Sequence, residues 1–276
     1  MKFQVLFSFC ILSILISSNV VDAQVAVAPP VVFMSPENRF DVLMIENRTS
    51  NTQEVSVEFK FGYPASDSLG VVAMQYADSS AERLYSIASW LKAFPKKFVL
   101  APGEQQSVRL ALTAPSSLPD GMYWTRIITT GAPQQKFVDT VRAGITTQLN
   151  YVFQQVTTAA FVKGKIVSLL AIQGKGIQRD SSGITILWYV DRTGNAPYFG
   201  TAVTKIFNQS GDLVDETKET LAIYFSMMKR SIFSTAKVKP GSYSVEVSLL
   251  PERTDIPRDQ LKLFGSFSQR FNVTIQ

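Results

Sequence analysis

From about residue 24 onward, apolar and polar residues alternate along short segments of the chain. In residues 55–61, Val55, Val57, Phe59 and Phe61 are separated by polar side chains, which is the two-residue period of a half-buried strand. Segments of similar strand character are 107–112, 122–128, 184–190, 199–207, 231–236, 243–249 and 267–275. Turn residues rich in Pro, Gly, Asn and Asp separate them. This pattern predicts an all-β protein.

The strands and turns recur at similar spacing in both halves of the chain, which predicts two immunoglobulin-like β-sandwiches. We expect the first over residues 24–153, a linker over 154–165 where the turn residues thin out, and the second over 166–276. Residues 79–91 carry the only helical spacing, with Leu84, Ile87 and Leu91 apolar. A strand near 88–91 preceded by a loop is the alternative.

The longest alternating segment is 141–153, VRAGITTQLNYVF. Its one face carries Val141, Ala143, Ile145, Thr147, Leu149, Tyr151 and Phe153. One interpretation is a long strand with that face packed on the core. The other is an edge strand that pairs its backbone with a partner, using the apolar residues of this face to fill a groove in that partner.

The N-terminus has the three parts of a secretory signal peptide. Lys2 precedes an apolar run over residues 3–16, and Val21-Asp22-Ala23 offers a cleavage site with small residues. The run is shorter than the roughly 20 residues that a spanning helix needs. We expect residues 1–23 to be a cleaved signal; an uncleaved anchor is the alternative. No later apolar run reaches membrane length, so the mature chain is not expected in the membrane.

Composition then removes several classes of function. The chain has no histidine and one cysteine, Cys10, which lies in the signal segment. Relays that depend on histidine, thiolate metal sites and intrachain disulfides are therefore excluded. The 27 basic residues exceed the 22 acidic ones, but they are scattered, so nucleic acid is not an expected partner. We predict no enzyme activity, no cofactor and no metal; a carbohydrate-active enzyme is the least supported alternative.

Several segments of the first half resemble one known family in their order and spacing. They are 31–33, VVF; 42–47, VLMIEN; 98–110, FVLAPGEQQSVRL; 118–124, LPDGMYW; and the alternating strand 141–153. Together they resemble the N-terminal domain of the PapD-like periplasmic pilus chaperones over roughly residues 25–153. The second half looks like a more general immunoglobulin-like module.

The resemblance implies an L-shaped pair of domains whose long strand completes the incomplete fold of a pilus subunit. It also implies an Arg in the first strand and a Lys in the long strand that hold the subunit's terminal carboxylate. This chain has Pro30 and Asn150 near those two positions, so the carboxylate anchor is not matched.

We therefore predict a periplasmic chaperone or binding protein of a Gram-negative bacterium that engages an exported, pilus-type client by strand addition. The alternative is a structural component of a cell-surface or pilus assembly, placed at the cell surface. Without a client, the edge is expected to be covered, for instance in a homodimer. The predicted partner-binding residues are Val141, Ala143, Ile145, Leu149, Tyr151 and Phe153.

Overall fold

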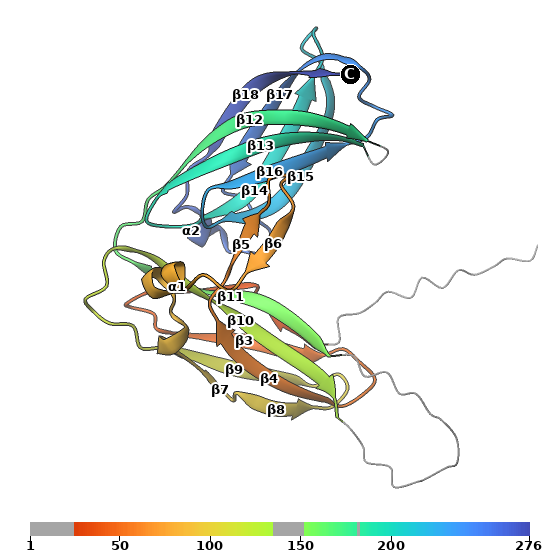
Figure 1. Ribbon diagram of the computed structural model, residues 1–276. Coiled ribbons are helices and arrows are strands. Elements are labelled where there is room, and N and C mark those ends of the chain that lie inside the picture. Colours follow the sequence, from red (N-terminus) through yellow and green to blue (C-terminus); the bar gives the residue numbers. More distant parts are fainter. Residues whose placement is uncertain (1–24, 135–151, 181–182) are drawn as a thin grey trace, which may run out of the picture.

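The computed structural model describes residues 25–134, 152–180 and 183–276. Within these residues the chain forms two β-sandwiches that meet at a narrow junction (Figure 1). The predicted all-β, two-sandwich fold is thereby confirmed, whereas the predicted signal segment 1–23 lies outside the described residues. None of the described helices has the length and apolar character needed to cross a membrane.

The first sandwich consists of a four-stranded and a five-stranded sheet. The four-stranded sheet has the order β1 (Val25–Ala28), β3 (Phe40–Asn47), β9 (Gln105–Leu112) and β7 (Leu91–Phe94). The five-stranded sheet has the order β2 (Val31–Met34), β11 (Phe153–Lys163), β10 (Gly121–Pro133), β4 (Gln53–Lys60) and β8 (Lys97–Leu100). The inward positions of both sheets, such as Leu43, Val57 and Ile127, are fully buried and form one core. Burial at every second residue explains the alternation seen in the sequence.

The first strand of the domain changes sheets. β1 pairs with β3 in the four-stranded sheet, and after Ala28 the chain continues as β2, which pairs in parallel with β11 in the other sheet. The parallel pairing covers only four residues, Val31 to Met34. Because this contact is short, β2 covers only part of that side of β11.

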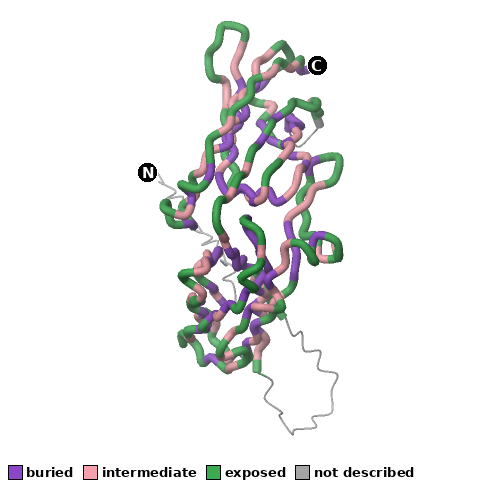
Figure 2. The backbone as a smooth tube through the Cα atoms, turned by 90° about the vertical axis from the view of Figure 1, so that its left-hand side faces the viewer, coloured by how far each residue is buried: buried purple, intermediate pink, exposed green. Residues whose placement is uncertain are grey.

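The second sandwich consists of a three-stranded and a four-stranded sheet. The first has the order β12 (Ser168–Asp180), β13 (Gly183–Gly194) and β16 (Met227–Phe233). The second has the order β15 (Leu213–Ile223), β14 (Tyr198–Phe207), β17 (Gly241–Leu250) and β18 (Phe267–Ile275). Trp188, Ile206 and Val247 are fully buried in its core. Buried positions continue through both sandwiches (Figure 2).

The predicted linker 154–165 is wrong for most of its length, because β11 extends to Lys163. Residues 157–161 are buried on both faces, since one face packs on the first core and the other on the domain junction. A strand buried on both faces loses the two-residue period, which is why the sequence pattern faded there. Only residues 164–167 connect β11 to β12, and Gly164, with φ +58°, lies at the bend.

The connection is held by hydrogen bonds to one side chain, that of Asn195 in the turn after β13. Its amide group donates to the carbonyl oxygens of Asp120 (2.9 Å) and Lys165 (3.0 Å), and its side-chain oxygen accepts from the N–H of Val167 (2.7 Å). The Asp120 carboxylate in turn accepts the N–H of Lys165 (3.0 Å). Both ends of the short connection are thus tied to the turns that flank it.

Between β4 and β7 the first domain carries an excursion that the strand pattern did not predict. It comprises a hairpin of β5 (Tyr63–Ser66) and β6 (Val72–Gln75), then α1 (Ser79–Tyr85) and the 3-10 helix Ala88–Trp90. The predicted helix is thus confirmed for its first half, and the alternative strand at 88–91 is wrong. A second short helix, α2 (Arg258–Leu261), follows β17 in the other domain.

Candidate functional site

β11 is covered by a neighbouring strand along only part of its length. On one side it pairs with β10 throughout, from Gly131 opposite Phe153 to Gly121 opposite Lys163. On the other side, β2 pairs only with Thr158 to Phe161. Among the described residues, no strand therefore pairs with that side of Gln154 to Thr157. An uncovered strand edge presents backbone N–H and C=O groups that a further strand can bind.

Three apolar side chains at and beside this uncovered end are exposed. Val156, opposite Ile128 of β10, is 41% exposed, and Val152 just before the strand is 61% exposed. Phe153, at the start of the strand, is 38% exposed. Exposed apolar residues beside an uncovered edge provide both of the elements that strand addition uses, namely backbone pairing and side-chain pockets.

The six predicted partner-binding residues fall mostly outside this region. Val141, Ala143, Ile145, Leu149 and Tyr151 lie outside the described residues, so their role stays a prediction. Phe153 belongs to β11, and by alternation it shares the face of Thr157, Ala159 and Phe161, which points to the core of the first domain.

Sequence reasoning missed Val152 and Val156, which stand on the opposite face of the strand from Phe153. The expected boundary at residue 153 removed Val156 from consideration. Residues 152–156 read VFQQV and break the alternation of the preceding segment, so no local pattern pointed to Val156.

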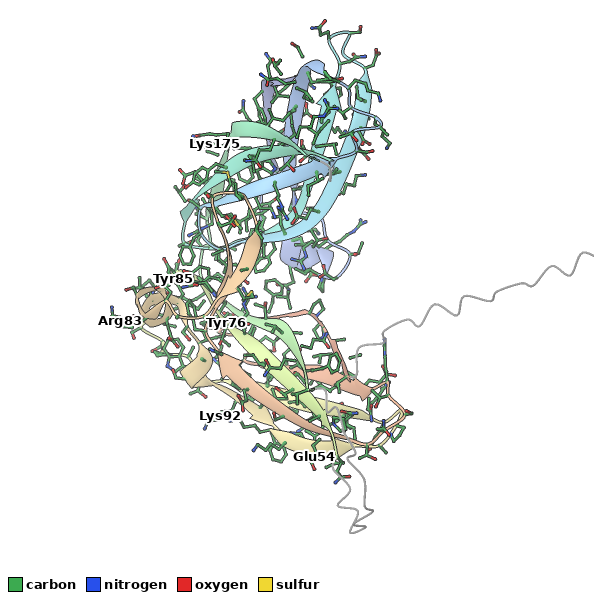
Figure 3. The ribbon with its side chains drawn as sticks, turned by 45° about the vertical axis from the view of Figure 1, so that its right-hand side comes forward. Glu54, Tyr76, Arg83, Tyr85, Lys92 and Lys175 are labelled. Carbon is green, nitrogen blue, oxygen red and sulfur yellow. The ribbon has the colours of Figure 1, made fainter. Side chains whose placement is uncertain are left out.

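An aromatic cluster joins the two domains at their junction. The indole of Trp124, on β10, stacks on Tyr85 of α1 (ring centroids 4.9 Å apart) and lies 4.8 Å from Tyr224 of the second domain. Tyr63 of the hairpin meets Phe225 of the second domain edge to face, at 4.6 Å. Tyr85 lies where α1 approaches the second domain (Figure 3). Such ring contacts stabilise by about 0.5–1.5 kcal/mol each beyond burial of their area.

Arg126 is a buried cation in this junction, with 7% of its surface exposed. Its Nε donates to the carbonyl of Gly62 (2.9 Å), its Nη1 donates to the hydroxyl of Thr158, and its guanidinium carbon lies 4.6 Å from the ring centroid of Tyr224. Its Nη2 has no hydrogen-bond partner, and no carboxylate among the described residues pairs with it. The aromatic ring of Tyr224 gives the charge a cation–π contact in place of an anion. Arg126 thus connects β10, β11 and the second domain.

The two carboxylate-anchor positions of the resemblance carry no charge here. Pro30 lies directly before β2, and its carbonyl accepts the N–H of Thr158 (3.0 Å). Asn150 lies outside the described residues.

The tip of the β5–β6 hairpin reaches the second domain. A Cβ atom on Gly70, which has φ +72°, would stand 2.8 Å from the carbonyl carbon of Lys229 in β16. Beside this contact the largely buried Lys229 ammonium is 2.6 Å from a carboxylate oxygen of Glu219 in β15. The hairpin therefore bridges the two domains at a second place, away from the short connection (Figure 1).

The hairpin base is tied to α1 by a tyrosine and a carboxylate. The hydroxyl of Tyr63 donates to Oδ2 of Asp78 (2.6 Å), while Oδ1 of Asp78 accepts the N–H of Ala81 and caps α1. Burial, followed by the hydrogen bond to Asp78, raises the pKa of Tyr63 to about 12. The Ala81 N–H and then the Tyr63 hydroxyl lower the pKa of Asp78.

Three solved structures are similar to this chain. The structure of the YadV chaperone matches 90% of this chain and 100% of its own, with a TM-score of 0.50 and 12% identity. The CsuC–CsuE chaperone–tip adhesion subunit complex of Acinetobacter baumannii covers 91% of this chain and 99% of its own (TM-score 0.46, 10% identity). For the Salmonella enterica SafA pilin in complex with the SafB chaperone, the shares are 91% and 96%, with a TM-score of 0.46 and 12% identity.

No protein-family model and no curated protein sequence matches the chain. The likeness to the YadV chaperone shows the fold, and the chain shares its two-domain β-sandwich fold. The resemblance predicted from the first half of the sequence is confirmed at this level and extends over both domains.

Proposed function

We propose that the chain is a periplasmic chaperone that holds an exported, pilus-type client by adding a strand to the uncovered edge of β11. The observation that carries this proposal is that β2 ends its pairing with β11 at Thr158, which leaves Gln154 to Thr157 uncovered among the described residues. The main-chain groups of this edge supply affinity, and exposed Val152 and Val156 enter a groove in the client. The role of the predicted residues Val141, Ala143, Ile145, Leu149 and Tyr151 stays a prediction, because they lie outside the described residues.

Three further features support the proposal. Two structures with similar folds are named as complexes of a chaperone with a pilin or tip adhesion subunit. The signal-like residues 1–23 agree with export to the periplasm. The edge offers backbone groups for pairing, and Val152 and Val156 beside it offer apolar contact. We infer a function in binding.

The test compares two valines of similar exposure on different strands. The client is first identified by mass spectrometry after purification of the chaperone from periplasm, and its binding is then measured with purified proteins. Val156→Glu should weaken binding at least about tenfold, because a carboxylate would be buried in an apolar groove. Val42→Glu, on β3 of the opposite sheet and 43% exposed, should leave binding unchanged. Hydrogen exchange at Gln154 to Thr157 should slow in the complex.

Equal loss of binding in both variants, or protection confined to another surface, would contradict strand addition at β11. Retention of the chain in finished surface fibres would instead support the structural alternative.

We also infer that two client-free copies pair through this edge. Light scattering should then show dimers of the wild type and monomers of Val156→Glu, and monomers of both would refute the pairing.

A further inference from the structure

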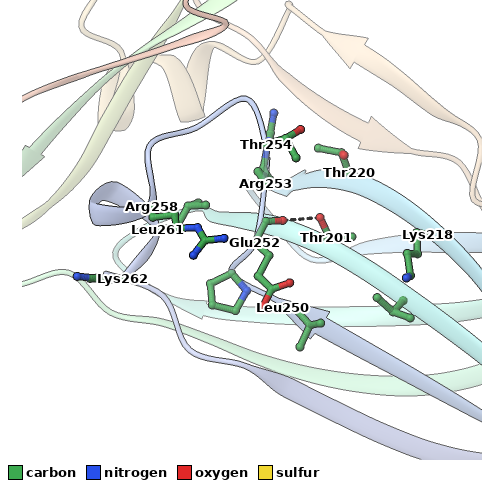
Figure 4. A pocket seen from close by; sticks show the side chains of 12 residues that line it. Thr201, Lys218, Thr220, Leu250, Glu252, Arg253, Thr254, Arg258, Leu261 and Lys262 are labelled. Atoms are coloured by element: carbon green, nitrogen blue, oxygen red, sulfur yellow. Dashed lines mark hydrogen bonds between the residues drawn. The ribbon is translucent and has the colours of Figure 1, made fainter.

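A cavity of about 600 Å³ opens on the outer face of the four-stranded sheet in the second domain. Its floor is formed by Thr201 and Val203 of β14 and its far wall by Lys218 and Thr220 of β15. Leu250 at the end of β17, the following residues 251–254 and one face of α2 close the other sides (Figure 4). This volume lies within the roughly 300–1,000 Å³ that ligand pockets usually occupy.

The charged side chains of this cavity are mostly basic. Lys218, Arg253, Arg258 and Lys262 line it, against one acidic residue, Glu252. Arg258 extends from α2 into the cavity, and Lys218 stands on the opposite side (Figure 4). The two cations thus face the cavity from elements that are distant in sequence.

The partners of these cations show which are available to a ligand. Arg253 is bound by Asp255, whose Oδ1 accepts from Nε at 2.8 Å. Lys218 has only an exposed ion pair with Glu216 at 3.2 Å, a kind of contact that contributes little. The side chains of Arg258 and Lys262 have no hydrogen bond or ion pair with any described residue.

Polar and apolar groups accompany the charges. The hydroxyl of Thr201 donates a hydrogen bond to the backbone carbonyl of Glu252, whereas the hydroxyls of Thr220 and Thr254 have no partner among the described residues. Val203, Leu250 and Leu261 add apolar surface. The cavity thus has cations at opposite sides, with hydroxyl groups and apolar surface between them. Such a spread of groups suits a short acidic peptide better than a single small anion.

We propose that this cavity binds an acidic peptide segment, with Arg258 and Lys218 pairing with its carboxylates. The site contains no residue of β11, so the proposal does not depend on strand addition. The Glu252 carboxylate repels an anionic ligand, so neutralising it should strengthen binding. The direction of this effect can be tested. The exposed setting predicts moderate affinity with strong dependence on salt.

The experiment measures fluorescence anisotropy of a labelled Gly-Asp-Glu-Asp-Glu-Gly peptide with the purified protein at low salt. The neutral peptide Gly-Asn-Gln-Asn-Gln-Gly is the matched ligand. We expect only the acidic peptide to bind. Arg258→Gln should weaken its binding about fivefold, and Glu252→Gln should strengthen it by a similar factor. Lys239→Gln, which removes an exposed cation outside the cavity, serves as the control and should leave binding unchanged.

Equal binding of both peptides, or an equal effect of Arg258→Gln and Lys239→Gln, would overturn the proposal. Displacement of the peptide by inorganic phosphate at equimolar concentration would assign the cavity to small anions and would also overturn it. Val156→Glu should bind the acidic peptide as the wild type does. This variant separates failure of the cavity from failure of the proposed function at β11.

Discussion

Tyr63 and Asp78 illustrate how single residues hold the hairpin and α1 together. The Asp78 carboxylate accepts hydrogen bonds from both the Tyr63 hydroxyl and the N–H of Ala81 in the first turn of α1. The raised pKa of Tyr63 means that the folded chain keeps this proton at a pH where the unfolded chain loses it. The resulting stabilisation is fully present below the ordinary tyrosine pKa of about 10 and is lost as pH rises through about 12.

Tyr63→Phe removes the hydroxyl and with it the hydrogen bond to Asp78. At pH 7 this loss should lower the free energy of unfolding by about 1 kcal/mol. Between pH 10 and 12 the difference in Tm between wild type and variant should shrink, because only the wild type loses stability through Tyr63 there. Thermal unfolding followed by circular dichroism over pH 7–12 measures both. Parallel curves over this range would show that Tyr63 is not coupled to folding.

At the scale of elements, the β5–β6 hairpin depends on a close approach of backbones at its tip. Gly70 adopts a positive φ and leaves no room for a Cβ beside Lys229. Gly103, in the turn between β8 and β9, has nearly the same φ, +75°, but no atom within 4 Å of an added Cβ. The two glycines therefore differ in surroundings and share backbone conformation.

We predict that Gly70→Ala destabilises the chain more than Gly103→Ala. Both substitutions incur about 1–2 kcal/mol of strain from a positive φ, and only the first also pushes the hairpin away from β16. Urea unfolding gives the two free energies, and limited proteolysis should cut the hairpin of Gly70→Ala faster. Equal destabilisation with equal proteolysis would mean that the tip does not hold the domains together.

At the scale of the whole molecule, the two domains are joined by buried contacts as well as by a short connection. Trp124 belongs to the same continuous buried cluster as Trp188 in the second domain, and both are fully buried. Their positions differ, because Trp124 touches rings of the other domain while Trp188 donates from its indole to Ser231 within its own domain. Burial of the junction fixes the relative orientation of the sandwiches.

We expect Trp124→Phe and Trp188→Phe to lower stability by similar amounts, about 1–3 kcal/mol, because both shrink a packed side chain and lose one indole hydrogen bond. Only Trp124→Phe should loosen the domains. Small-angle X-ray scattering should show a broader distance distribution for this variant and an unchanged one for Trp188→Phe. The same distribution for both would place the control of domain orientation elsewhere.

Much of the fold followed from local patterns. Alternation in segments such as 55–61 and 243–249 predicted strands, and both lie in strands of the structure apart from the last residue of the first, Phe61. Turns between the strands were predicted from residue type, and Gly103, in the turn between β8 and β9, has the positive φ that such a turn needs. These features depend on neighbouring residues alone, so the sequence expresses them directly.

The candidate site was only partly predictable. The sequence predicted an edge strand over residues 141–153, most of which lies outside the described residues, and the uncovered edge that the structure describes runs from Gln154 to Thr157. Burial of residues 157–161 on both faces removed the period that would have extended the strand to Lys163. The buried Arg126 and the cavity beside α2 each bring together residues that are distant along the chain, and no local pattern identifies them.

The sequence by itself determined that this is an all-β protein of two sandwiches, because alternation and turn residues are properties of the chain. Its lack of histidine excludes the relays that depend on that residue. Only the tertiary structure decided which part of β11 is uncovered, how the hairpin crosses to the second domain and where basic side chains converge. Those features depend on which strands become neighbours across a sheet or a junction. Such pairings form between distant segments, and their outcome is set by how the whole chain packs.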